Sequence, residues 1–227
     1  MASGSVLSLF RYPVKSMAGE RLDNVVLDEH GIEGDRKHAV WLRGGRKLTA
    51  RVAPKMLAWH ASLNGGAPVP SVVGPDGTTY GWDDELERAV GAHIGKDVAL
   101  VQDPHGLHDV QGTLLVTVEA SRRRLEEELG FPLDIRRFRT NVHVDLPGTE
   151  PFEESGWEGR HIRIGDAELE IVHPCDRCAI TISDPETLEQ APGVLRVINE
   201  RHDTFFGFRV QPRGPARIAV GDPVTPA

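Results

Sequence analysis

The sequence predicts a mainly β fold with a few helices, of the α+β class. Short runs of β-branched and aromatic residues recur along its 227 residues, and turn-forming residues are frequent, with 24 glycines and 16 prolines. Stretches with helical periodicity are few. We expect one or two small β-barrels, because closing a sheet on itself removes its exposed edges.

Five strands are predicted in the first hundred residues, from runs of β-branched or aromatic side chains bounded by turn-forming residues. They cover Val6–Tyr12, Asn24–Leu27, His38–Leu42, Leu57–Leu63 and Val98–Gln102. A hairpin-like turn is expected at the sequence GPDG, residues 74–77.

A change of hydrophobic period predicts a helix over residues 83–95. Leu86, Val90 and Ile94 fall on one helical face, and acidic residues occupy the first turn, where the helix dipole favours negative charge. Gly95 is placed to end this helix, since glycine adopts the left-handed conformation of a helix C-terminus without strain.

A loop over residues 104–112 separates the two halves of the chain, and more strands than helices are predicted beyond it. The strands are Thr113–Val118, Phe138–Val144, His161–Ile164, Glu168–His173, Cys178–Ile182, Phe205–Val210 and Arg217–Val220, and the helices are Ala120–Leu129 and Gly193–Asn199. Gly165 and Asp166 predict a hairpin turn between the third and fourth of these strands.

Composition and charge exclude several classes of protein. The hydrophobic content of 39% and the charged content of 26% are ordinary for a soluble globular chain. A net charge of −8 argues against a nucleic-acid-binding protein, which would present a basic surface. We find neither a signal peptide nor an apolar stretch of roughly 18 residues, so we expect no membrane partner, a cytoplasmic location and reduced thiols.

The stretch HPCDRCAIT, residues 173–181, holds both cysteines of the chain, Cys175 and Cys178. A reactive dithiol would lie at a helix N-terminus, and structural zinc would need further ligands that no nearby motif supplies. Two other interpretations are a pair of small buried residues, or a single thiolate that the adjacent Arg177 favours and that suits a soft-ligated metal. The residues alone leave these interpretations open.

Five segments together resemble the MOSC proteins, the family named for the C-terminal domain of molybdenum cofactor sulfurase. They are RYPVKSMAGE (residues 11–20), GDRKHAVW (34–41), FRTNVHVD (138–145), HPCDRCAITISDPET (173–187) and IAVGDPV (218–224). The pattern is most similar to the mitochondrial amidoxime-reducing component and its bacterial counterparts. The resemblance implies a smaller N-terminal β-barrel-like domain over residues 1–100 and a β-barrel MOSC domain over residues 101–227.

The resemblance also implies a molybdenum cofactor, which is a pterin dithiolene that carries a phosphate. Cys178 matches the cysteine that ligates molybdenum in the family, and Cys175 is expected to be a packed residue without a metal. Lys15, Ser16 and Arg36 match positions that hold the phosphate or its neighbourhood, where a cation and a hydroxyl suit an anion.

A second set of residues matches the family's contacts to the pterin. Arg139, Thr140 and Asn141 match a strand that hydrogen-bonds it, and an amide side chain carries the donor and acceptor that a pterin edge requires. Arg177 is expected to contact the cofactor beside the metal ligand. These assignments complete the cofactor-binding site that the resemblance implies.

The implied activity is a molybdenum-dependent reduction of N-hydroxylated small molecules, such as amidoximes, N-hydroxy bases and N-oxides. In such an enzyme the cofactor carries the redox chemistry, and the protein supplies binding, orientation and electrostatics. Cys178, Asp109 and Asp176 are the candidate catalytic residues, and the two acids are the groups to test for proton donation.

Electrons are expected to come from a separate redox partner, such as a ferredoxin, a flavoprotein or a b-type cytochrome. The chain has no flavin or dinucleotide fingerprint, and its two cysteines are too few for an iron–sulfur cluster of the usual four-cysteine type. It also ends shortly after IAVGDPV, where some bacterial relatives continue into a ferredoxin-like domain.

A sulfur carrier, or a carrier or storage protein for the molybdenum cofactor, is the alternative function. Either would use Cys178, the sulfur carrier as a persulfide. Lys15, Arg36, Arg139 and Asn141 favour a protein that holds the cofactor, because a persulfide alone needs no phosphate-binding residues. Turnover with an artificial electron donor would separate an enzyme from a storage protein.

Overall fold

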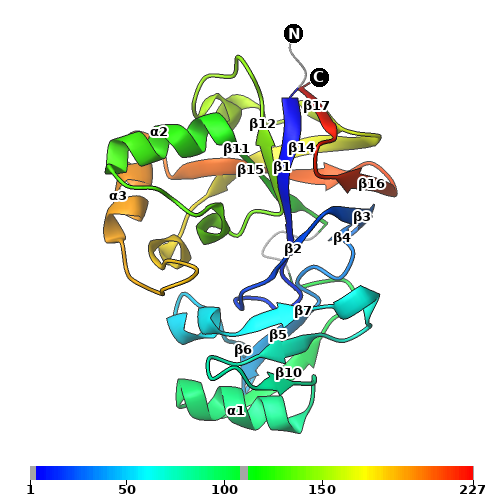
Figure 1. Cartoon of the computed structure of the whole chain (residues 1–227), viewed down its shortest axis with the longest axis vertical. Coiled ribbons are helices and arrows are strands. Elements are labelled where there is room, and N and C mark those ends of the chain that lie inside the picture. Colours follow the sequence, from blue (N-terminus) through cyan, green and yellow to red (C-terminus); the bar gives the residue numbers. More distant parts are fainter. Residues whose placement is uncertain (1–3, 108–111, 227) are drawn as a thin grey trace.

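The larger part of the molecule is a closed β-barrel (Figure 1). The computed structural model describes residues 4–107 and 112–226. The seven barrel strands are β1 Gly4–Arg11, β11 Leu114–Val118, β12 Val142–Asp145, β13 His161–Ile164, β14 Ala167–Asp176, β15 Phe205–Pro212 and β17 Pro223–Pro226. They pair in the order β12-β11-β15-β14-β13-β17-β1, and β1 closes the barrel by pairing with β12. The predicted mainly β fold is confirmed.

Side chains alternate across the barrel wall, so each strand has an inner and an outer face. Leu114 and Val116 of β11 and Phe208 of β15 lie in the apolar core of the barrel. Leu115 and Arg209 pair across these two strands and belong to the opposite face. The outer face of β11 and β15 is therefore available as a wall for a site outside the barrel.

A smaller lobe, residues 38–102, lies below the barrel in Figure 1. It contains β5 His38–Leu42, β6 Arg46–Lys47, β7 His60–Ser62, β8 Ser71–Val73, β9 Thr79–Tyr80, α1 Asp84–Ile94 and β10 Val98–Gln102. The strands form two three-stranded sheets, β10-β5-β6 and β7-β8-β9, around a second apolar core. Asp83 caps α1 by accepting hydrogen bonds from two backbone N–H groups, and Gly95 ends it at φ 72°, as predicted.

Strands from the first hundred residues also belong to the barrel side of the molecule. β1 is a barrel strand, and β2 Glu20–Leu22 pairs with it. β3 Asn24–Asp28 and β4 Gly31–Ile32 form a sheet with β16 Ala216–Ala219. The division into domains of residues 1–100 and 101–227 stays a prediction. Strands from the first range form hydrogen-bonded pairs with strands from the second.

Two helices, α2 Glu119–Leu129 and α3 Pro192–Arg201, lie on one side of the barrel (Figure 1). They enclose a third apolar cluster, in which the rings of Phe138 and Phe206 stack with their centroids 4.0 Å apart. Within residues 4–107 and 112–226, no helix combines the length and the apolar character that crossing a membrane requires.

The predicted strand Phe138–Val144 is wrong over its first half. A 3₁₀ helix covers Ile135–Phe138, and β12 begins only at Val142. Arg139 between them has φ 55°, a left-handed conformation that a strand does not allow. Consequently Arg139, Thr140 and Asn141 precede the strand in which they were expected to lie.

The predicted extended segment Cys178–Ile182 is also wrong. Its β-branched residues form a 3₁₀ helix, because the backbone N–H and the hydroxyl of Thr181 both donate to the carbonyl oxygen of Cys178, at 3.0 and 2.9 Å. The predicted strand Leu57–Leu63 is correct only over β7, His60–Ser62.

Candidate functional site

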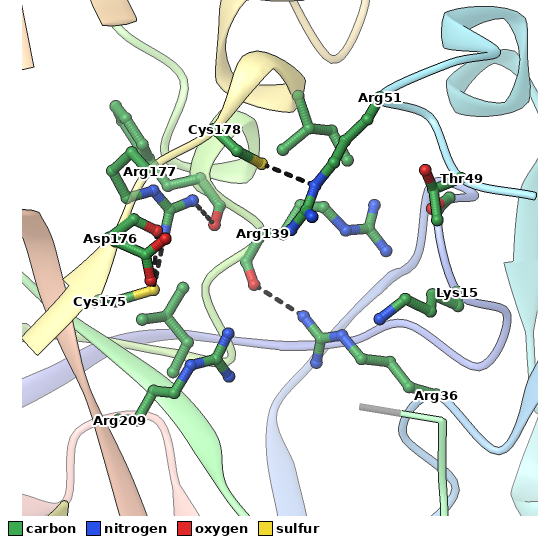
Figure 2. Close-up of a pocket in the computed structure, with 14 residues that line it drawn as sticks. Lys15, Arg36, Thr49, Arg51, Arg139, Cys175, Asp176, Arg177, Cys178 and Arg209 are labelled. Atoms are coloured by element: carbon green, nitrogen blue, oxygen red, sulfur yellow. Dashed lines mark hydrogen bonds between the residues drawn. The ribbon is translucent and has the colours of Figure 1, made fainter. Parts of the chain in front are cut away.

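A pocket with about 700 Å³ of space, partly open to solvent, lies where the barrel meets the smaller lobe (Figure 2). The N-terminal part of the chain supplies Lys15, Ser16, Arg36, Thr49 and Arg51, and the barrel side supplies Leu115, Phe138, Arg139, Cys175, Asp176, Arg177, Cys178, Ile180 and Arg209. The pocket is therefore formed by residues that are far apart in sequence.

The pocket lining is strongly basic, although the whole protein has a net charge of −8. Its cations are Lys15, Arg36, Arg51, Arg139, Arg177 and Arg209. Among the described lining residues Asp176 is the only carboxylate. Figure 2 shows the cationic side chains converging on a common space. Such a concentration of positive charge favours an anionic ligand.

Three residues of the lining have strained backbone conformations. Ser16, Arg36 and Arg139 have φ values of 71°, 51° and 55°, in the left-handed region that side chains other than glycine seldom adopt. Such strain persists only where the surrounding structure enforces it, and it is concentrated at functional sites. All three were expected to be site residues from the resemblance alone.

A buried network fixes the guanidinium group of Arg36. Its Nη1 forms an ion pair with the carboxylate of Asp35, whose side chain is fully buried, and donates to Oδ1 of Asn141 at 3.1 Å. Its Nη2 donates to the carbonyl oxygen of Arg139 at 3.0 Å. The network joins the segment before β5 to the segment before β12, so it couples the two sides of the pocket.

The ring of Tyr12 lies beneath two of the pocket arginines. The guanidinium carbon of Arg139 lies 4.2 Å from the ring centroid, and that of Arg36 lies 5.0 Å from it. Nη1 of Arg139 also donates to the carbonyl oxygen of Met17 at 2.8 Å. Burial raises the pKa of Tyr12 to about 12, so its phenol stays neutral.

The two cysteines occupy different environments, and both are free thiols. Cys178 is half-buried in the pocket wall, and its Sγ accepts a hydrogen bond from Nε of Arg51 at 3.2 Å. Cys175 is only 2% exposed, and its Sγ accepts from Nη1 of Arg177 at 3.1 Å. Cys178 is therefore the thiol with access to a ligand.

A buried arginine outside the pocket holds the backbone that follows Cys178. Arg137 is 5% exposed, and its Nη1 donates to the carbonyl oxygens of Thr181 and Ile182, at 3.3 and 3.1 Å. Its Nη2 donates to Oδ2 of Asp184 at 2.8 Å. The 3₁₀ turn that positions Cys178 is thereby fixed to the segment that carries Arg139.

Family profiles match most of the chain in two parts. The MOSC domain matches residues 93–225, and the MOSC N-terminal beta barrel domain matches residues 3–75. The protein belongs to the MOSC domain family. This confirms the resemblance stated from the sequence motifs.

The relatives of this MOSC protein include two kinds of named protein. Molybdenum cofactor sulfurase of Drosophila grimshawi is 25% identical over 97% of this chain, which spans only 34% of that protein. Mitochondrial amidoxime-reducing component 1 of Homo sapiens is 29% identical over 97% of this chain and 82% of that protein. The YUAD protein from Bacillus subtilis has a similar fold, with a TM-score of 0.54 at 15% identity over 98% of this chain and 94% of that chain.

The MOSC fold brings most of the predicted site residues into the pocket, and these are Lys15, Ser16, Arg36, Arg139, Asp176, Arg177 and Cys178. Thr140 and Asn141 are instead fully buried behind the wall. The amide of Asn141 is occupied by protein partners, since it donates to the carbonyl oxygen of Phe10 and the carboxylate of Asp35 and accepts from Arg36 and from the N–H of Leu115. Asp109 lies outside the described residues.

Three polar or charged lining residues, Thr49, Arg51 and Arg209, were not predicted from the sequence. Thr49 and Arg51 belong to a polar turn, and nothing in the sequence brings that turn to Cys178. Arg209 alternates with buried apolar residues of β15, a pattern that predicts an ordinary solvent-facing arginine. Among the described residues no cluster of three or more His, Cys, Asp or Glu side chains could hold a metal.

Proposed function

We propose that this MOSC protein is a molybdenum-cofactor-dependent oxidoreductase that reduces N-hydroxylated compounds. The observation that carries the proposal is the half-buried thiol of Cys178 at the wall of a strongly basic pocket. A soft thiolate suits molybdenum, and the surrounding cations suit a phosphate-bearing, anionic cofactor. The similarity to a mitochondrial amidoxime-reducing component over most of both chains supports the N-hydroxylated substrate.

The residues present fit the proposed cofactor. The pocket offers a thiol, hydroxyls from Ser16 and Thr49, and more cations than its single described carboxylate can neutralise. Nε of Arg177 is buried without a hydrogen-bond partner among the described residues, which is costly unless a ligand satisfies it. Cys178 would hold the metal, and Lys15 and Arg36 with the two hydroxyls would hold the phosphate.

When bound, this cofactor supplies two-electron chemistry that removes oxygen from an N–O bond. Each turnover of an N-hydroxylated substrate consumes two electrons and two protons and releases one water. Asp176 is the exposed carboxylate of the pocket wall, at the end of β14, and we propose it as the group that passes a proton to the departing oxygen. The fixed arginines orient the ligands and offset the negative charge brought by the cofactor.

We further propose that the electrons come from a separate protein, such as a ferredoxin, a flavoprotein or a b-type cytochrome. The acidic net charge of −8 suits docking to a donor with a basic face. The described cysteines, Cys175 and Cys178, are too few for a four-cysteine cluster within this chain.

A turnover experiment tests the proposal. Protein expressed in a host that makes the cofactor is given benzamidoxime and chemically reduced methyl viologen, and benzamidine is quantified. We expect benzamidine from the wild type and none above background from Cys178→Ala. A cofactor-loaded wild type without turnover, carrying a persulfide on Cys178 by mass spectrometry, would favour the sulfur-carrier alternative, which the sulfurase relative suggests.

A further inference from the structure

The backbone of Arg209 is fixed within the sheet that forms one wall of the pocket. It lies in the middle of β15, where its backbone pairs with Leu115 of β11 on one side and with His173 of β14 on the other. A side chain at the centre of three paired strands has a fixed origin and direction, unlike one on a loop. Arg209 and Leu115 both line the pocket from this outer face of the barrel.

The guanidinium of Arg209 differs from those of the other pocket arginines in its partners. Within the described part of the chain Arg209 makes no side-chain hydrogen bond and no ion pair. By contrast, Arg36 donates to Asn141, Arg51 to Cys178, Arg139 to Met17 and Arg177 to Cys175.

A half-buried cation without a counter-ion carries a desolvation cost that its attraction to an anionic ligand would offset. A guanidinium also presents paired N–H donors that match the two oxygens of a carboxylate. These properties make Arg209 suited to recognise an oxyanion.

Arg209 lies apart from the corner proposed to hold the cofactor phosphate. Figure 2 shows Arg209 on the side of Cys175 and Asp176, whereas Lys15 and Thr49 lie on the opposite side. The phosphate corner already contains Lys15, Ser16 and Thr49, together with Arg36. The side that contains Arg209 and Asp176 is therefore the part of the pocket left for a substrate.

We infer that Arg209 binds an anionic group of the substrate, so that the preferred substrate is an N-hydroxylated compound that also carries a carboxylate. The N-hydroxylated part of this substrate rests on the proposed function. Its carboxylate is inferred from Arg209 alone. A neutral amidoxime of the same size binds more weakly, because it leaves the guanidinium without a counter-ion.

The test compares two probes that differ only in charge, 4-carboxybenzamidoxime and benzamidoxime. Their dissociation constants are measured by calorimetry on cofactor-loaded protein without reductant, and their KM and kcat with reduced methyl viologen. In Arg209→Gln we expect the carboxylate probe to bind about tenfold or more weakly, the usual scale for a charge-assisted hydrogen bond. Binding of benzamidoxime should change by less than about twofold.

Two further variants control for general charge and for the shape of the side chain. Arg213→Gln removes a cation at a half-exposed position outside the pocket lining, and it should leave both dissociation constants unchanged. Arg209→Lys keeps the charge without the paired donors, so it should restore part of the lost affinity. The effect on turnover should appear in KM, with little change in kcat.

Three outcomes would overturn the inference. One is a wild type that does not prefer the carboxylate probe, and another is an Arg213→Gln effect as large as that of Arg209→Gln. The third is a loss of bound pterin in Arg209→Gln, which would assign Arg209 to the cofactor phosphate. A carboxylate preference that depends on Arg209 in a protein without reductase activity would support the inference and refute the proposed function.

Discussion

Two buried networks of this protein both consist of hydrogen-bonded polar and charged side chains. Only one of them includes a residue that lines the pocket. The pocket network consists of Asp35, Arg36 and Asn141, and it fixes a guanidinium that lines the pocket. The second, which we term the sealed network, consists of Thr117, Glu119 and His143. In it, Nε2 of His143 lies 2.9 Å from the Glu119 carboxylate, and Nδ1 lies 3.0 Å from the Thr117 hydroxyl.

The sealed network has the residue types of a hydroxyl–imidazole–carboxylate triad, which is a common catalytic arrangement. However, its three residues are at most 6% exposed, and none of them lines the pocket. Buried, well-paired charges therefore mark a functional site only where they fix a group that a ligand can reach. The two networks should accordingly respond differently to mutation.

The largest effect is expected for Asp35→Asn in the pocket network. The change leaves the charge of Arg36 without its buried partner, which typically costs about 3–5 kcal/mol of unfolding free energy. It also releases the guanidinium from its position in the pocket, so bound pterin per chain should fall. Denaturant unfolding and fluorescence of the oxidised pterin measure the two effects, and full pterin retention would contradict this role of Asp35.

A smaller effect, confined to stability, is expected for Glu119→Gln in the sealed network. Burial would raise the pKa of Glu119, but hydrogen bonds from Arg122, His143 and Arg123 outweigh burial and lower it. A lowered pKa stabilises the folded state above the unfolded value of 4.5, and this stabilisation is lost as the pH falls below it.

The variant should therefore lose about 2–3 kcal/mol at pH 7 and show a weaker dependence on acid than the wild type. Urea unfolding at several pH values measures this difference. Its pterin content should equal that of the wild type, and a fall in pterin content would show that the sealed network also supports the site.

A third buried carboxylate, Glu154, has a hydroxyl partner but no described cationic partner, so its response to pH should have the opposite sign. Ser121 donates to it at 2.8 Å, and burial raises its pKa from 4.5 to about 7. A raised pKa means that its stabilising contribution is present below pH 4.5 and is lost as the pH rises through about 7.

Glu154→Gln removes the ionisable group, so the variant does not lose stability in this way as the pH rises. Relative to the wild type, the variant should gain about 2 kcal/mol of unfolding free energy between pH 5 and pH 8. Thermal unfolding across this range is the measurement, and parallel curves for the two proteins would contradict the prediction.

The smallest effect is expected for Tyr12→Phe beneath the pocket network. The phenol oxygen of Tyr12 is buried without a hydrogen-bond partner among the described residues, so its removal should change stability by less than about 1 kcal/mol. The aromatic ring remains under Arg36 and Arg139, and pterin content should stay at the wild-type level. Tyr12→Leu removes the ring, so a pterin content no lower than that of Tyr12→Phe would exclude a role for cation–π stacking.

Local sequence patterns predicted the elements whose structure depends on their own residues. β5 and β10 have the predicted bounds, His38–Leu42 and Val98–Gln102, and Gly95 ends α1 as expected. The resemblance placed Lys15, Ser16, Arg36 and Arg139 in one site, and the structure brings their side chains to one pocket.

The features that could not be predicted depend on contacts between distant parts of the chain. Arg139 precedes a strand but adopts a left-handed conformation, which its contacts with Arg36 and Met17 hold in place. Arg51 and Arg209 enter the site only because a turn of the smaller lobe meets the outer face of β15. The residue pattern within either segment does not predict that the two segments lie next to each other.

The proposed function requires that Cys178, and not Cys175, holds a molybdenum cofactor in this pocket. The most direct test measures molybdenum and pterin per chain in the wild type, Cys178→Ala and Cys175→Ala, all expressed in a host that makes the cofactor. We expect about one molybdenum per chain in the wild type and in Cys175→Ala, and loss of the metal in Cys178→Ala. A wild type without molybdenum, where a known molybdoenzyme loads fully, or equal loss in both variants, would contradict it.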